Sequence, residues 1–469
     1  MKNQKFFSSL TAVLLVASFS AQTTAQINIT PSTTTGQVYL VKAALEGRGV
    51  VQPEENQSLQ MDVDARFQYQ ERVIARKTQL KSIRDYELAR ANIRIDNKPL
   101  NSRLADARKV VIVQTKSTGQ QIKLASLGGP MTQSEFELVN TPANTLILSE
   151  VFAKDRVKVG DTWSPDSQVL AQFFNIESVD KSDVRIELAN VKGKDAILVI
   201  AGNIEGNVDG AITQIALNGS VRFNSSLGSV TQANLTISQQ RDIGLVVPGL
   251  DATFKLLISL KPIEQSETLS DAGLASLRKN AGSITDDLLL TPEGSSVSLI
   301  HPRQWRVISN HRARTILRYN QNGRMIGQCE ILPLPSRLPN QEQTLEQFQA
   351  VVKNKLAENT GEIESANASQ SENGLEWMRV KASGTTNGVN LQWIYYTLSS
   401  PDGRRVQLVF TTEPAYANMF TNTERFLVDS LKFESIDASS TQKLPAQPAS
   451  AKKTSTEKTD VKTVDSDKK

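Results

Sequence analysis

The sequence predicts two domains: a mainly-β antiparallel meander, built as a curved sheet or open barrel with short capping helices, followed by an α+β sandwich. Three observations predict this organisation. The chain has 469 residues, which is too long for one ordinary domain. Residues 38–263 alternate apolar and polar side chains over long stretches, with short Gly, Asn and Ser turns between them. Residues 291–436 mix strand patterns with helix patterns.

Residues 1–25 have the pattern of a secretory signal peptide. A lysine-containing start precedes the apolar run 10–17, and small and polar residues follow. The best small-x-small cleavage site ends at Ala25, and cleavage near Ser20 or Ala21 is the alternative. No later apolar run approaches the length of a membrane span. We therefore expect an exported bacterial protein, periplasmic or extracellular, without a transmembrane segment after cleavage.

Composition narrows the classes of partner. The chain has 53 Lys and Arg against 49 Asp and Glu, and this near balance argues against nucleic acid. Its single cysteine, Cys329, cannot form an intramolecular disulfide, so packing alone must stabilise both domains. Residues 26–37 are expected to be a flexible N-terminus.

The first domain is expected at 38–263. In the segment SLQMDVDARFQYQERV, apolar and polar side chains alternate, which predicts a long strand with one buried face and one wet face. The apolar side is Leu59, Met61, Val63, Ala65, Phe67 and Tyr69, and the polar side is Gln60, Asp62, Asp64, Arg66, Gln68 and Gln70. Further strands are expected at 109–115, 120–126, 183–191, 196–202, 212–223, 229–241 and 252–263. Short turns between them, such as 117–119, predict an antiparallel meander.

Two short helices are expected to interrupt this meander. Residues 132–135 have the pattern of a capped first turn, and a second helical segment is expected at 144–152. The segment VKVGDTW then places a turn before Trp163. This first half resembles uncharacterised exported bacterial proteins with a VGDxW motif, which implies a fold and no activity. Asp161 is expected to be a turn residue that bonds its own backbone, with a functional role as the alternative.

Residues 264–290 are polar and are expected to be a linker with a short helix from Ser270 to Asn280. The second domain, at 291–436, is expected to have the order strand, strand, helix, three-stranded meander, helix, strand. Its first strand stops at Pro302. The capping pattern of Thr344 with Gln347 begins its first helix.

This second half resembles the PsbP-like α/β sandwich. The resemblance rests on Pro302 and Trp305 at the end of the first strand, on Trp393 and Tyr396 in the meander, and on the closing segment 428–433. It implies a fold and a small binding module. The family has no common catalytic site, so the resemblance implies no catalytic residues.

Both histidines and the cysteine lie between residues 298 and 331, where a His/Cys catalytic pair or a metal site has to be considered. His301 and His311 are ten residues apart with a proline and a tryptophan between them, unlike a zinc-ligand spacing. Cys329 lies on an expected strand with no adjacent base. We therefore expect all three to be structural, and we assign no catalytic, cofactor-binding or metal-binding residue.

Two acidic segments are candidates for a binding site. Glu205 and Asp209 lie in GNIEGNVDG, where a hairpin or bulged turn is favoured over a calcium loop because a loop needs denser oxygen ligands. Asp286 and Asp287 are expected at the solvated end of the linker.

The sequence therefore predicts an exported, non-catalytic protein of the cell envelope that binds a protein or polymer partner. The alternative is a carrier of a lipid or another apolar ligand within the curved sheet. A hydrolase with dispersed catalytic residues is the third possibility. Residues 437–469 are rich in Lys, Ser and Thr and are expected to be a disordered tail; an electrostatic tether to anionic envelope polymers is the alternative.

Overall fold

A computed structural model describes residues 26–434, apart from 33, 77–78, 117–121, 281–283, 322, 339–341, 357–360 and 371–373. The signal peptide expected at 1–25, the turn expected at 117–119 and the tail expected at 437–469 lie outside the described residues.

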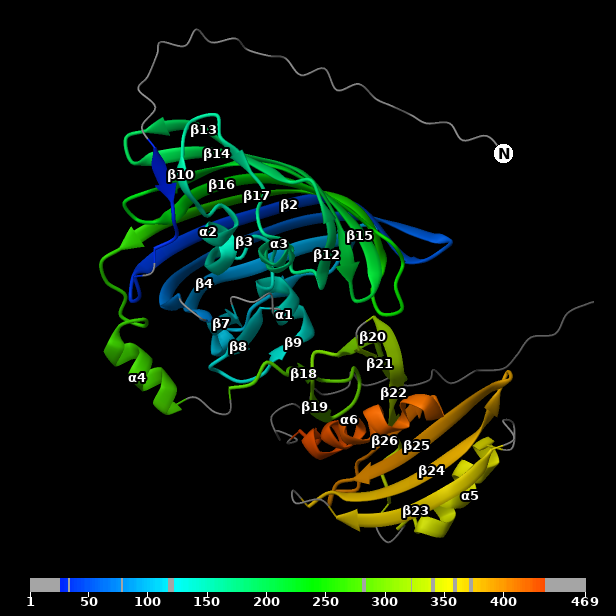
Figure 1. Cartoon of the computed structure of the whole chain (residues 1–469). Coiled ribbons are helices and arrows are strands. Elements are labelled where there is room, and N and C mark those ends of the chain that lie inside the picture. The colour runs from blue at the N-terminus through cyan, green and yellow to red at the C-terminus, as the bar shows by residue number, and fades with distance from the viewer. Residues whose placement is uncertain are drawn as a thin grey trace, which may run out of the picture. The chain divides into compact units, whose positions relative to one another are not determined.

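The long alternating patterns form one large sheet (Figure 1). Its main strands, in sheet order, are β11 (Thr162–Trp163), β13 (Arg185–Lys192), β14 (Asp195–Val208), β15 (Ala211–Asn224), β16 (Ser229–Arg241), β17 (Gly249–Ile263), β2 (Val38–Glu54), β3 (Gln57–Arg76), β4 (Gln79–Ile95), β7 (Val110–Lys116) and β8 (Lys123–Ser126). Three short strands pair beside this path, β12 (Ser178–Ser182) with β14, and β5 (Lys98–Pro99) and β6 (Ser102–Arg103) with β4. Every pairing is antiparallel, as expected. Among the described strands the sheet is open, with β11 and β8 at its edges.

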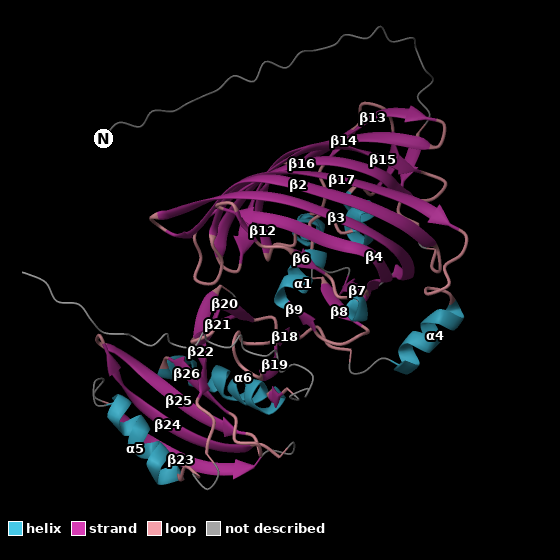
Figure 2. Ribbon diagram, turned by 180° about the vertical axis from the view of Figure 1, so that it is seen from behind, coloured by secondary structure: helices cyan, strands magenta, loops and turns pink. Residues whose placement is uncertain are grey.

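Three short helices pack against one face of this sheet: α1 (Gln133–Val139), α2 (Thr145–Val151) and α3 (Ser167–Phe174). Figures 1 and 2 show the sheet arching over them. We call the face toward these helices the inner face and the opposite one the outer face. The predicted alternation is confirmed, because Ala65, Phe67 and Tyr69 of β3 are buried in the core on the inner face.

Side-chain caps begin these helices. The capping box expected between Thr132 and Glu135 starts α1. The Asn144 side chain accepts a hydrogen bond from the N–H of Leu146 at the start of α2, and Asp166 caps α3. Helix α3 was missing from the sequence prediction. Among the described residues, no helix is both long and apolar enough to cross a membrane.

The expectation of a flexible stretch at 26–37 is not what the structure shows. Strand β1 (Ile27–Ile29) pairs with β10 (Lys154–Val157), and Ile29 is fully buried in the core of the large sheet. The segment is too short and too polar for periodicity to reveal it. Its order comes from contacts with a strand more than a hundred residues away.

A second antiparallel sheet follows. Its strands, in sheet order, are β20 (Trp305–His311), β21 (Arg314–Gln321), β22 (Arg324–Leu334), β26 (Arg405–Thr412), β25 (Val389–Ser399), β24 (Glu376–Thr386) and β23 (Glu362–Gln370). Helix α5 (Leu345–Leu356) packs on the face that carries Trp393 and Tyr395. Helix α6 (Ala417–Ser430), preceded by the short helix η3 (Pro414–Tyr416), packs on the face that carries Ile394 and Tyr396. The expected capping box of Thr344 and Gln347 is present at α5.

This second half contains more strands than the sequence predicted. The four strands β19 (Val297–His301) to β22 precede α5, where the sequence predicted two, and β23 adds a fourth strand to the meander. Strand β23 is an edge strand with a mostly exposed, polar sequence. Its apolar contacts are limited to Ile363 and Ala366, and its backbone pairs with β24, so periodicity could not reveal it.

The division into two domains with a linker is not confirmed. Strand β18 (Leu288–Leu290), inside the expected linker, pairs in parallel with β9 (Met131–Thr132) of the first half and antiparallel with β19 (Val297–His301) of the second. Strand β27 (Lys432–Phe433) completes this small sheet. The linker helix is α4 (Asp271–Asn280), and its Leu274 packs with residues of β2 and β4. The described residues up to Phe433 form one compact unit.

Candidate functional site

The three reactive residues singled out in the sequence do not line the cavities described below. His301 ends β19 fully buried, with its Nδ1 3.1 Å from the carbonyl oxygen of Pro302. Burial lowers the pKa of His301 to about 4, so its ring is neutral near pH 7. Cys329 is fully buried in β22, and burial raises the pKa of its thiol well above the ordinary value. His311 is exposed at the end of β20.

The acidic residues singled out in the sequence have local partners. Asp161 accepts a hydrogen bond from the backbone N–H of Lys158 at 2.8 Å, which is a turn role. Glu205 pairs with Lys181 at 3.0 Å. Asp209 lies in the two-residue turn of the β14–β15 hairpin, as predicted. In the linker, Asp287 accepts a hydrogen bond from Thr285, and Asp286 lies 3.4 Å from the Lys123 ammonium. No group of three or more His, Cys, Asp or Glu among the described residues could hold a metal ion.

A buried ion pair lies on the inner face of the large sheet. Glu71 of β3 and Arg84 of β4 are cross-strand partners whose side chains are each 3% exposed. The Arg84 Nε lies 2.8 Å from the Glu71 Oε1. Ser82 donates to the same oxygen at 2.7 Å, and Thr145 donates to Oε2 at 2.5 Å. Arg84 also donates to Asn144, the N-terminal cap of α2. This polar cluster therefore fixes the start of α2 to two strands.

The polar cluster is charged but closed to ligands. Burial alone would raise the pKa of Glu71, but the Arg84 charge and the hydrogen bonds from Thr145 and Ser82 outweigh it, so the pKa is lowered. The cavity beside Arg84, Thr145 and Tyr86 has a volume of about 20 Å³. That space is about the size of one water molecule. We therefore interpret the cluster as a structural clamp.

The outer face of the large sheet is different, because it carries three hollows. Two neighbouring cross-strand rows form the largest of them. In the strand order β14, β15, β16, β17, β2, β3, β4, they are Ile197, Arg222, Gln232, Ser259, Lys42, Gln68 and Leu88, and then Val199, Ser220, Asn234, Leu257, Ala44, Arg66 and Arg90. This hollow has a volume of about 920 Å³. We call it the basic hollow, because Lys42, Arg66, Arg90 and Arg222 are its charged lining residues.

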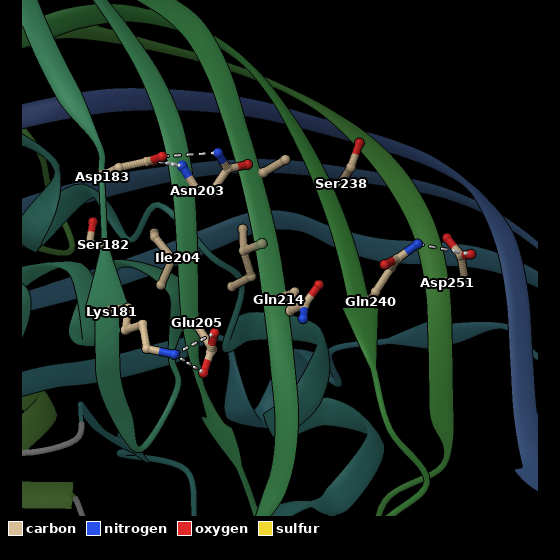
Figure 3. Close-up of a pocket in the computed structure, with 12 residues that line it drawn as sticks. Lys181, Ser182, Asp183, Asn203, Ile204, Glu205, Gln214, Ser238, Gln240 and Asp251 are labelled. Atoms are coloured by element: carbon tan, nitrogen blue, oxygen red, sulfur yellow. Dashed lines mark hydrogen bonds and ion pairs between the residues drawn. The ribbon is translucent and has the colours of Figure 1, made fainter. Parts of the chain in front are cut away.

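The second hollow lies farther along the same strands, toward the hairpin at Asp209, and has a volume of about 700 Å³ (Figure 3). Its lining is polar, with small residues such as Ala216 and Ser238 in the middle. The contacts drawn there join Asp183 to Asn203, Lys181 to Glu205 and Gln240 to Asp251. We call it the polar hollow. Lys181 and Glu205 neutralise one another, whereas Asp183 and Asp251 accept hydrogen bonds from neutral amides and keep their negative charge.

A third hollow of about 680 Å³ lies between β17, β2, β3 and β4, and its charges are largely paired. Arg66 contacts Glu46 at 2.6 Å and Asp64 at 3.1 Å. Arg48 contacts Asp62 at 3.1 Å. Charge along the outer face therefore changes from a basic end, through a neutralised middle, to a polar end.

Sequence reasoning predicted a wet face but missed this pattern. The polar side of β3, including Arg66, was assigned correctly to solvent. What local alternation could not show is that Lys42, Arg90 and Arg222, far apart in the chain, come to one end of that face. The polar cluster was missed for a different reason. Glu71 lies two residues after Tyr69, so the alternation of β3 places it on the buried side of the strand. This alternation was the sequence signal that could have predicted a buried charge.

Comparison with known proteins leaves the family open. No protein-family model matches the chain, and no curated protein matches its sequence. A Ran-binding protein of Saccharomyces cerevisiae, Mog1p, is 8% identical with a TM-score of 0.26, covering 31% of this chain and 95% of that one. A putative regulator of unknown function from Pseudomonas aeruginosa is 10% identical with a TM-score of 0.22, covering 31% and 94%.

A loop-deletion mutant of an outer membrane protein of Vibrio cholerae is 5% identical with a TM-score of 0.12, covering 81% of this chain and 99% of that one. All three scores are too low to carry an argument about function. The partial likeness to Mog1p is weak, and the two family resemblances of the sequence stay predictions.

Proposed function

We propose that this chain is an exported, non-catalytic protein of the bacterial cell envelope, which binds a polymer or protein partner on the outer face of its large sheet. The observation that carries the proposal is the contrast between the two faces. The inner face packs against α1, α2 and α3 and borders one hollow of about 700 Å³ beside Phe136 and Phe174, whereas the outer face holds three hollows of about 680 to 920 Å³. A PsbP-like module in residues 291–436, itself a proposal, is consistent with a binding role.

The surface of the outer face supports broad contact with a partner. Small side chains occupy the middle of the sheet, including Ala44, Ala216, Ser220, Ser238 and Ser259. Such residues let a partner approach the backbone closely over a wide area, and they lose little side-chain entropy when they are covered. The outer face is therefore suited to hold an extended partner.

The carrier of an apolar ligand has less support. It required a hollow space between the curved sheet and the helices. In the structure, Phe136, Phe152 and Phe173 are fully buried in the core between them, and the cavity beside the polar cluster is about 20 Å³. A larger hollow of about 700 Å³ borders α1 and α3, but its lining includes Arg241, Arg303, Arg306 and Arg318, which suit an apolar ligand poorly. A lipid needs a cavity of several hundred Å³.

Substitutions that place large side chains on the outer face test the proposal. Ala216→Tyr and Ser220→Tyr add neutral side chains that suit a strand but block close approach. The measurement is co-sedimentation of labelled protein with envelope fragments of the host. We expect the apparent affinity to fall by about tenfold or more. Asn367→Tyr, on exposed strand β23, is the matched control and should bind like wild type. Equal binding by all variants, or no binding by wild type, would contradict the proposal.

A further inference from the structure

We propose that the basic hollow binds an anionic polysaccharide, whose chain lies across the strands and places successive negative groups on Lys42, Arg90 and Arg222. This inference rests on the proposed function and specifies its partner. The four charged side chains that line the hollow are all basic, although the whole chain is nearly neutral. This local excess of positive charge favours an anionic partner.

Three of these four cations are free to bind an anion. Arg66 is held by Glu46 and Asp64 on its own face. Among the described residues, no carboxylate forms an ion pair with Lys42, Arg90 or Arg222. The carboxylate of Glu87, at the bulge beside Leu88, accepts a hydrogen bond from Gln68. An anionic partner therefore gains three attractive contacts without breaking an existing ion pair.

Spacing argues for a polymer rather than a small anion. Arg222 and Lys42 lie in one cross-strand row with β16 and β17 between them. Three strand spacings place their backbones about 14 Å apart. With both side chains standing roughly perpendicular to the sheet, one phosphate or carboxylate does not bridge them, whereas a chain that repeats its charges can contact both.

The lining also discriminates among polyanions. The two rows contain no aromatic side chain, and the aromatic lining residue Phe67 is 6% exposed and packs in the core on the inner face, so it offers no exposed platform on which nucleic acid bases could stack. The larger apolar side chains of these rows that line the hollow are Leu257, 51% exposed, Leu88, 37% exposed, and Ile197, which is half-buried. These side chains line a concavity about 920 Å³ in volume, which fits a chain better than a flat bilayer. The hydroxyl and amide groups of Ser220, Ser259 and Asn234 can hydrogen bond to sugar hydroxyls.

The test uses polygalacturonate as the carboxylate-bearing probe, neutral dextran of similar length, and vesicles that contain phosphatidylglycerol. The full chain is titrated at low ionic strength, and the dissociation constant is measured by fluorescence anisotropy. Wild type should bind polygalacturonate and should not bind dextran. Its affinity for polygalacturonate should fall as salt is added, because exposed charge contacts are screened.

The main variant is the triple substitution Lys42→Gln, Arg90→Gln and Arg222→Gln. With about fivefold for each cation near a polyanion, we expect the affinity of the triple variant for polygalacturonate to fall about 100-fold. The matched control is Arg48→Gln, Arg94→Gln and Lys255→Gln, which line the neutralised middle of the same face. Both triples lower the formal net charge from +4 to +1, since 4 − 3 = 1, and the control should lose less than about threefold.

Several outcomes overturn the inference: no polygalacturonate binding by wild type, equal losses in the two triples, or stronger binding to vesicles than to the polysaccharide. If the main triple has an altered thermal unfolding profile, the salt dependence and dextran control of wild type decide instead. If the inference fails while Ala216→Tyr still releases the protein from envelope fragments, the proposed function stands with a partner of different chemistry.

Discussion

On the inner face of the large sheet, Glu71 and Arg84 form an ion pair whose side chains are each 3% exposed. On the outer face, Arg66 pairs with Glu46 at a similar distance, but the two side chains are 35% and 60% exposed. The inner pair is surrounded by hydroxyl and amide groups that satisfy both charges. The outer pair is surrounded by water. Similar chemistry therefore serves stability on one face and leaves the other face available for binding.

The largest expected effect comes from breaking the inner pair. Arg84→Met leaves the Glu71 carboxylate buried without its cation, so we expect a loss of about 3–5 kcal/mol in the free energy of unfolding. Arg66→Met removes the cation of the exposed ion pair on the outer face. We expect this variant to lose less than about 1 kcal/mol in the free energy of unfolding. Urea denaturation of both variants measures the difference. Similar losses would show that burial does not separate the two faces.

Substitutions of apolar side chains compare the two faces without changing any charge. Leu146 of α2 is fully buried against the inner face, and Leu257 is 51% exposed on the outer face. We expect Leu146→Ala to lose about 2–5 kcal/mol, because it leaves a cavity. Leu257→Ala should change stability by no more than about 0.5 kcal/mol. Thermal unfolding compares them, and a large loss for Leu257→Ala would mean that the outer face contributes to the core.

The pH dependence of stability should separate two buried carboxylates. Glu424 of α6 pairs with Arg379 at 3.0 Å, but one of its oxygens has no partner. Burial raises its pKa above the ordinary value of 4.5, more than Arg379 lowers it. The pKa of Glu71 is lowered below 4.5 despite burial. The ionised form is thus favoured by folding at Glu71 and disfavoured at Glu424.

The signs follow from these directions. A lowered pKa at Glu71 gives stability that is present above pH 4.5 and is lost as the pH falls below it, so the loss caused by Glu71→Gln should shrink in that lower window. A raised pKa at Glu424 makes the wild type relatively less stable as the pH rises above 4.5, so the loss caused by Glu424→Gln should shrink toward neutral pH. Urea unfolding at pH 3.5, 4.5 and 7 measures both trends, and parallel trends would be inconsistent with these pKa directions.

The smallest expected effect concerns the neutralised middle of the outer face. Arg48 contacts Asp62, with side-chain exposures of 88% and 58%. We expect Arg48→Gln to change the free energy of unfolding by less than about 0.5 kcal/mol, and this difference should disappear at high salt. Chemical denaturation at two ionic strengths checks it. A salt-independent loss above that size would mean that the pair is less solvated than its exposure indicates.

Sequence periodicity predicted much of the first half. It placed the long strands, the wet and buried sides of β3 and the capped start of α1. It failed for β1 and β23, which are polar or short strands defined by a partner strand. The predicted division into two domains is not confirmed, and the pairing of Leu288 in β18 with Met131 in β9 joins segments 157 residues apart, since 288 − 131 = 157.

By itself, the sequence determined which face of the long alternating strands is buried, because side-chain alternation is a local property of an extended chain. It also determined that His301 and His311 are spaced unlike metal ligands. Tertiary structure alone decided which wet faces lie side by side. Arg222 and Lys42 share one row, and Glu71 opposes Arg84, because strand order and register are set by contacts across the whole sheet. That non-local register creates both the clamp inside the sheet and the basic hollow outside it.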